Sequence, residues 1–196
     1  MYMKRNKKKN LETITDNELM QKIQAGDVEK LGLLFERYKR MLFGFFYRVI
    51  GNKEVSEDLV QNVFIRILRF KNQFRGEGKF TTWMYRIARN EIADHFKKEK
   101  KFGYKDDISN LSEKIDGDPL AGQRSFKEDQ LQLLNYALQK ISNENRELIV
   151  MNRYQGLKYK EIGEMLDVSE GAVKVRTFRA MNELKKAYSQ LEAKTI

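Results

Sequence analysis

The sequence of 196 residues contains no cysteine, one proline and one histidine. The absence of cysteine excludes disulfides and cysteine-ligated zinc, and it is typical of a reducing cytoplasm. The single histidine, His95, follows Glu91 by four residues, so both can share one helix face. A zinc site needs three or four ligands, and no second histidine completes the set. We therefore expect no metal, no cofactor and no catalytic residue in this chain.

The sequence also lacks a long apolar run. The longest apolar cluster, over 41–50, is interrupted by Gly44 and Arg48, well short of the ~20 residues of a membrane-spanning helix. The first ten residues include five basic ones but no apolar run follows them, so no signal peptide is predicted. We expect no membrane insertion and a cytoplasmic location.

Basic residues exceed acidic ones, which gives a formal net charge of +10. A charge of this sign and size favours a polyanionic partner, with nucleic acid first and an anionic membrane surface second. With 34% of residues charged and one proline, the composition is typical of a helix-rich fold.

Helical periodicity predicts the first domain. Thr15 and Glu18 have the spacing of a capping box, which predicts a short helix over 16–25. A longer helix follows, because apolar residues recur at steps of three and four until Gly51: Leu31, Phe35, Tyr38, Leu42, Phe45 and Val49. The next helix is predicted over 54–70.

The first domain ends with one more helix, which we expect to be capped by Thr81 or Thr82 and to reach about 98. Beyond it, the periodicity stops and glycines and five acidic residues accumulate, which indicates a linker. The predicted organisation is, in order, a basic N-terminal tail, a first domain, a linker and a second domain, over residues 1–14, 15–101, 102–125 and 126–196.

The second domain is predicted to be helical as well. Ser142 can cap a helix that ends near Gly156, and two helices follow over 159–166 and 170–188. No segment alternates with the period of a strand. The predicted fold class is therefore all-α, with two small helical domains joined by a flexible linker.

Residues 159–176 have the spacing of a helix-turn-helix. Gly163 permits a close helix contact and Ser169 can cap the second helix, which would enter the major groove of duplex DNA. The outward-facing residues of that helix are Gly171, Lys174, Val175, Phe178 and Arg179. Because such motifs alone give many false matches, a purely structural helix pair is the alternative.

Residues 74–90 join a glycine-containing loop to a helix rich in aromatics and arginines. Aromatic faces stack on bases and guanidinium groups hold phosphates, a combination suited to unpaired DNA. Four residues share one face of this helix: Arg86, Asn90, Ala93 and Lys97. Tyr85 and Arg89 flank that face, whereas Trp83, Met84 and Ile87 are predicted to be buried. The loop is not a P-loop, because Gln73 replaces the first glycine and Phe80 follows the lysine.

Two segments carry a resemblance to a known family. Phe74–Asn90 closely resembles the promoter-melting region of bacterial RNA polymerase sigma factors, of the sigma-70 family and its extracytoplasmic-function (ECF) subfamily. Val173–Ala180 resembles the −35 reading helix of that subfamily, and the match extends back through Asn145–Ile149, the scaffold helix of region 4. The resemblance covers about 31–101 and 130–186, in the family's domain order.

The resemblance implies a sigma factor that binds core RNA polymerase and directs transcription initiation at −10 and −35 elements. The loop over 70–79 would accept a base flipped from the non-template strand. The residues implied for single-stranded −10 DNA are Phe74, Tyr85, Arg86 and Asn90. For Phe74, a position in the core is an equal alternative. The residues implied for the −35 duplex are Lys174, Val175, Phe178 and Arg179.

The family also implies protein partners: the β′ clamp helices and β flap of the polymerase, and an anti-sigma factor. Glu57–Phe64 resembles region 2.2, which docks on the β′ clamp. Asp58 and Gln61 lie one turn apart and can pair with a partner helix. Asn62 stands where the family usually has glutamate, so the salt-bridge pattern of this docking face differs. An exposed polar face without a binding role is the alternative.

Two other functions fit part of the sequence. A DNA-binding regulator could use the helix-turn-helix without polymerase, but it needs a sensor or dimerisation domain that the first domain does not resemble. An RNA-binding or membrane-surface protein accounts for the charge alone. Neither alternative explains a motif for unpaired DNA joined to a motif for duplex DNA.

Overall fold

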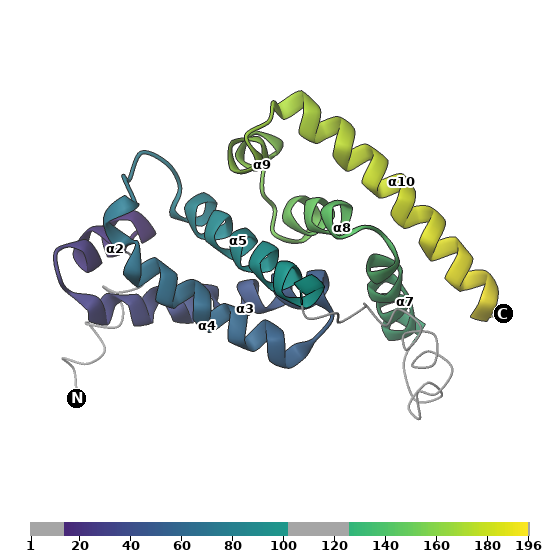
Figure 1. Cartoon of the computed structure of the whole chain (residues 1–196), viewed down its shortest axis with the longest axis horizontal. Helices are drawn as coiled ribbons and strands as arrows, with labels where there is room; N and C mark the ends of the chain where they lie inside the picture. Colours follow the sequence, from purple (N-terminus) through teal and green to yellow (C-terminus); the bar gives the residue numbers. More distant parts are fainter. Residues whose placement is uncertain (1–13, 102–125, 196) are drawn as a thin grey trace.

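The computed structural model describes residues 14–101 and 126–195, and within these ranges the chain is helical and has no strand (Figure 1). The predicted linker and all but the last residue of the predicted tail lie outside the described residues. The helices, in chain order, are α2 (Asp16–Gln24), α3 (Leu31–Ile50), α4 (Lys53–Arg69), α5 (Phe80–Lys101), α7 (Phe126–Lys140), α8 (Asn143–Ile149), α9 (Tyr159–Leu166) and α10 (Glu170–Thr195). Short helical turns cover Val28–Lys30, Lys71–Gln73 and Val150–Tyr154. The all-α prediction is confirmed.

Local signals set most helix boundaries. Thr15 and Glu18 form the predicted capping box at α2, and the hydroxyl of Ser142 accepts from the backbone N–H of Asn145 at the start of α8. Gly51 ends α3 with φ of 81°, a conformation that glycine adopts without steric cost.

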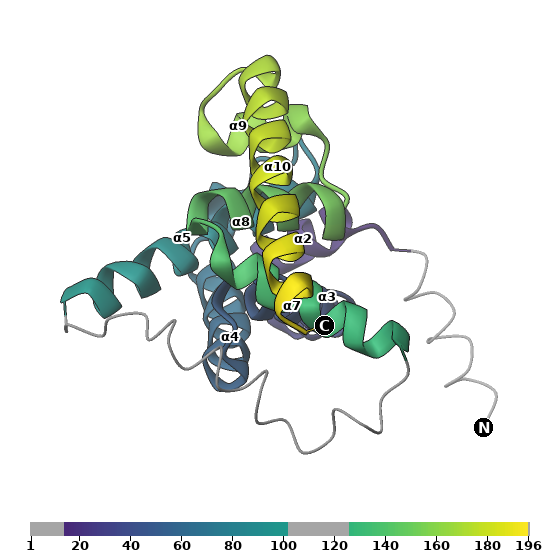
Figure 2. The ribbon, with the colours of Figure 1, turned by 90° about the vertical axis from the view of Figure 1, so that its right-hand side faces the viewer.

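Two predicted boundaries are wrong. Helix α5 begins at Phe80, so Thr81 and Thr82 lie inside its first turn and neither is the cap. The backbone N–H of Trp83 donates a hydrogen bond to the carbonyl of Lys79, so the helix has begun before Thr81. Helix α10 continues to Thr195 rather than 188, because its far half packs against α7 (Figure 2).

The first domain is built around α3, α4 and α5, and α4 packs against both of the other two. Four aromatic side chains fill the space between them: Phe45, Phe46, Phe80 and Tyr85. This hydrophobic cluster continues into the second domain through Leu148, Val150, Met151, Leu157, Ile162, Met165 and Val173. A second cluster lies between α7, α8 and α10. The two domains therefore share part of one core, which the sequence did not predict.

Candidate nucleic-acid and polymerase interfaces

The outer face of α5 carries two of the residues expected at unpaired DNA. Arg86 and Asn90 lie one turn apart and both are exposed. The guanidinium of Arg86 also donates to the backbone carbonyl of Glu164 on α9, at 2.6 Å. Asn90 remains open to solvent, where its amide can donate and accept hydrogen bonds with a base edge.

The position of Tyr85 corrects the sequence prediction, which placed this side chain beside the exposed face of α5. Its side chain is 1% exposed, packs edge-on against Phe45 and donates a hydrogen bond of 2.6 Å to Oε1 of Gln155. Burial raises the pKa of the Tyr85 phenol, so the phenol stays protonated and remains a donor. In this conformation Tyr85 belongs to the contact between the domains.

Phe74 lies in the core, the alternative that the sequence left open. It is 6% exposed and packs against Phe80 and Trp83. The side chain of Gln24 donates to the carbonyls of Lys71 and Phe74, both at 2.8 Å. Helix α2 therefore holds the start of the glycine-containing loop in place.

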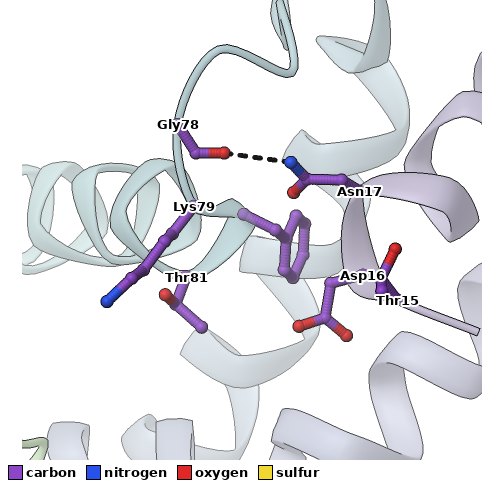
Figure 3. Close-up of a pocket in the computed structure, with 7 residues that line it drawn as sticks. Thr15, Asp16, Asn17, Gly78, Lys79 and Thr81 are labelled. Carbon is purple, nitrogen blue, oxygen red and sulfur yellow. Dashed lines mark hydrogen bonds between the residues drawn. The ribbon is translucent and has the colours of Figure 1, made fainter. Parts of the chain in front are cut away.

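A pocket of about 430 Å³ lies where the loop passes the start of α2 (Figure 3). Its lining residues are Thr15, Asp16, Asn17, Gly78, Lys79, Phe80 and Thr81. The amide of Asn17 donates to the carbonyl of Gly78 at 3.1 Å and to that of Gly76 at 3.3 Å. Gly76 has φ of 75°, a backbone conformation that residues with a side chain rarely adopt, so glycine allows the loop to turn here. Sequence reasoning missed α2 as a wall of this site, because only the tertiary fold brings it to the loop.

The carboxylate of Asp16 in this pocket is already engaged. It accepts from Arg37 at 2.8 Å and from the hydroxyl of Tyr38. Burial and the bond to Asp16 raise the pKa of Tyr38. Because its charge is paired, Asp16 repels the phosphates of a nucleic acid less than an unpaired carboxylate would.

The helix-turn-helix has the predicted internal contacts. A Cβ on Gly163 would lie 2.7 Å from the carbonyl oxygen of Val168, so only glycine fits beside the turn. The hydroxyl of Ser169 accepts from the backbone N–H of Ala172 and caps α10. All four residues expected at the −35 duplex are exposed on α10: Lys174, Val175, Phe178 and Arg179. Phe178 is 67% exposed, which is unusual for a phenylalanine without a partner.

The expected polymerase-docking face on α4 is open to solvent. Asp58 and Gln61 are exposed, as the sequence predicted, and Asn62 is exposed beside them. Ile65 lies one turn beyond Gln61 and is 61% exposed, an apolar residue next to this polar face that sequence reasoning missed. A protein partner that covered this face would also remove the apolar area of Ile65 from water.

Among residues 14–101 and 126–195, no group of three or more potential metal ligands is close enough to hold an ion. His95 instead lies 3.2 Å from Glu99. In the same part of the chain, no helix is both long and apolar enough to cross a membrane.

Comparison with known families gives the class of the protein. The Sigma-70 region 2 family matches residues 34–102, and the Sigma-70, region 4 family matches residues 131–184. The first segment contains most of α3 and all of α4 and α5, and the second contains most of α7, all of α8 and α9, and the first part of α10.

Curated relatives narrow the class. The chain is 30% identical to the ECF RNA polymerase sigma factor SigW of Bacillus subtilis over 179 residues, which cover 88% of this chain and 96% of the relative. It is also 30% identical to the ECF RNA polymerase sigma-E factor of Haemophilus influenzae over 178 residues, 86% of this chain and 93% of that one. The chain belongs to the ECF RNA polymerase sigma factors.

Solved structures share the fold. CnrH, solved in complex with the cytosolic domain of CnrY, aligns with a TM-score of 0.65 at 23% identity and covers 91% of this chain and 97% of CnrH. The sigma factor RpoE of Bartonella quintana, solved with the anti-sigma factor NepR, aligns with a TM-score of 0.61 at 22% identity, over 83% of this chain and 97% of that one.

Proposed function

We propose that the chain binds core RNA polymerase and directs it to promoters by reading a −35 duplex with α10 and an unpaired −10 strand with α5 and its loop. One observation carries this proposal. A single chain presents the exposed face of a helix-turn-helix and, on a separate domain, an exposed arginine and asparagine on the helix whose first residues line a loop pocket. The polymerase supplies the chemistry, and the chain itself is not an enzyme.

The −10 site is proposed to hold one extruded base in the pocket between α2 and the loop. Extrusion costs a few kcal/mol of stacking, which contacts in the pocket must offset. The pocket offers the hydroxyl of Thr81 and the side-chain oxygen of Asn17, whose NH2 group already donates to the loop. Lys79 can hold the phosphate once it leaves its 2.9 Å ion pair with Glu161. Asn90 and Arg86 continue this surface along α5.

The −35 site is proposed to lie on α10. Lys174 and Arg179 can reach phosphates or the acceptor atoms of guanine, and Val175 and Phe178 can contact thymine methyl groups. Lys174 is paired with Glu170 at 2.7 Å in the free chain. Because that pair is exposed, exchanging it for a DNA contact costs little.

The polymerase is proposed to dock its β′ clamp helices on the α4 face formed by Asp58, Gln61, Asn62 and Ile65, and its flap on the second domain.

The boundaries 15–101 and 126–196 are proposed for the two domains. We further propose an anti-sigma factor as a regulator and the cytoplasm as the location. The Bartonella quintana protein of similar fold is solved with such a factor.

Transcription in vitro with purified core polymerase tests the proposal. We expect core enzyme plus this chain to start transcription at a defined set of promoters and core enzyme alone to ignore them. A DNA-binding regulator without polymerase contacts would bind duplex DNA in the same assay but would not convert the core enzyme to specific initiation.

A further inference from the structure

Helix α2 forms one wall of the loop pocket, although it lies outside the segment that matches the Sigma-70 region 2 family, which begins at residue 34. Two side-chain amides on α2, two turns apart, share one helix face. Gln24 donates to two carbonyls at the start of the loop, both at 2.8 Å. Asn17 donates to the carbonyls of Gly76 and Gly78. Helix α2 therefore holds the loop at two places.

The two bonds of Asn17 fix the direction of its amide. Both loop groups are carbonyl oxygens, at 3.3 Å in Gly76 and 3.1 Å in Gly78, and a carbonyl can only accept a hydrogen bond. The NH2 group of Asn17 uses its two hydrogens there, so its side-chain oxygen is left to accept. Figure 3 shows the nitrogen turned to Gly78 and the oxygen on the side of Asp16 and Thr81. The pocket thus presents an acceptor whose orientation the loop sets.

Asp16 adds a second acceptor to the same wall. Its carboxylate accepts from Arg37 and Tyr38, and each carboxylate oxygen has a further lone pair. An exocyclic amino group carries two hydrogens and can donate to both acceptors. Thymine has a single N3–H between two carbonyl oxygens, so in this place it would turn an oxygen toward an acceptor and leave that acceptor unpaired, which is unfavourable.

We propose that Asn17 is a specificity-determining residue for the −10 strand. Its side-chain oxygen accepts a hydrogen bond from the exocyclic amino group of the extruded base, so the pocket takes adenine, cytosine or guanine in preference to thymine. This inference rests on the proposed function of the loop pocket. It gives α2 a reading role in addition to that proposed for Asn90 on α5.

A pool of promoters with a randomised −10 element tests the preference in the wild-type holoenzyme. Barcoded transcripts identify the positions of the non-template strand at which thymine is disfavoured. At such a position the favoured base is then replaced by the analogue that lacks only the amino group. The analogues are purine for adenine, 2-pyrimidinone for cytosine and hypoxanthine for guanine, so the favoured base also selects among the three.

The analogue is placed in a premelted template, where the position is unpaired and altered base pairing does not contribute. We expect the wild-type holoenzyme to bind the template with the analogue about threefold or more weakly than the template with the parent base, because one hydrogen bond is lost. Equal binding of the base and its analogue at every such position would overturn the proposal. This comparison needs no substitution in the protein.

Asn17→Ala connects the preference to α2. This variant should assemble with core polymerase, and at one position it should bind the base and its analogue equally. Gln24→Ala is the control for holding the loop, because it removes two bonds to the loop but no group that lines the pocket. It should keep the preference. Gln21→Ala, exposed on the same helix, should match the wild type.

Two results with the variants would contradict a reading role. One is full discrimination between base and analogue in Asn17→Ala. The other is an equal loss of the preference in Gln24→Ala, which would mean that Asn17 acts through the conformation of the loop. If circular dichroism shows that Asn17→Ala is unfolded, Asn17→Ser, whose side chain is shorter, takes its place.

The same pool distinguishes this inference from the proposed function. Failure of the wild-type holoenzyme to start transcription from any template would contradict the proposed function. Specific transcription in which no position disfavours thymine would contradict only the reading role of Asn17.

Discussion

The guanidinium of Arg146 on α8 donates a 2.5 Å hydrogen bond to the backbone carbonyl of Val49 in the last turn of α3. The same guanidinium donates to the carbonyls of Leu138, Gln139 and Ile141 at the end of α7. The last carbonyls of a helix have no partner within the helix. One buried arginine therefore satisfies the ends of two helices that belong to different domains.

Arg146→Lys should destabilise the fold. A lysine keeps the charge but cannot reach four carbonyls with a planar fork, and the carbonyls left unpaired are buried. We expect a loss of about 3 kcal/mol or more in the free energy of unfolding, measured by urea denaturation. Arg153→Lys, at an exposed position on the neighbouring turn, is the control and should change it by less than about 0.5 kcal/mol.

Stability should depend on pH through Glu147. Burial, the larger effect, raises the pKa of Glu147 to about 7, although Arg89 opposes the rise. The folded chain therefore binds a proton that the unfolded chain releases at lower pH. This contribution is complete below the ordinary glutamate pKa, and it falls as the pH rises to 7.

Wild-type chain should consequently lose on the order of 2 kcal/mol of stability between pH 5.5 and 8 relative to Glu147→Gln, which cannot titrate. Urea denaturation of both proteins at the two pH values measures the difference. If the wild-type chain and Glu147→Gln change in stability by the same amount between the two pH values, Glu147 is ionised throughout that range.

Reversing charge on the docking face should weaken assembly with polymerase. Asp58→Lys with Gln61→Lys changes an exposed surface, so the fold should be kept, while affinity for core polymerase should drop about tenfold or more. Glu36→Lys, exposed on α3, is the control. A pull-down in which the folded double variant binds core enzyme as well as wild type would exclude this face.

Lys174→Ala and Arg179→Ala should reduce binding of the full chain to a cognate −35 duplex by about 1–3 kcal/mol each where a base contact is lost. A base contact changes sequence preference, whereas a phosphate contact weakens all sequences alike. Fluorescence anisotropy with cognate and scrambled duplexes separates the two cases. Lys186→Ala, farther along α10, is the control. If Lys174→Ala and Arg179→Ala both bind the cognate duplex with wild-type affinity, α10 does not contact the groove as proposed.

Asn90→Ala should separate opening from duplex recognition. The holoenzyme should assemble and bind the −35 duplex normally, because neither surface includes Asn90, but it should open promoters poorly and with relaxed −10 base preference. A premelted template should recover part of the transcription. Permanganate footprinting of unpaired thymines provides the measurement, and normal opening with unchanged base preference would remove Asn90 from the site.

The sequence by itself determined the helices, because their signals are local. The capping box of Thr15 and Glu18, the apolar stripe of α3 and Ser142 each act within a few residues of themselves. The helix-turn-helix was predictable for the same reason, since Gly163 and Ser169 contact near neighbours. The exposure of Asp58 and Gln61 followed from the periodicity of α4.

Only the tertiary structure decided what lies against these helices. The sequence left Phe74 open to DNA or the core, and it placed Tyr85 beside the DNA-facing side of α5. Their actual positions depend on Trp83, Phe45 and Gln155, which come from other turns and helices. The role of α2 in the loop pocket and the bonds of Arg146 join residues tens of positions apart. Helical periodicity reports that a face is buried but not which partner buries it, because burial of apolar area is non-directional.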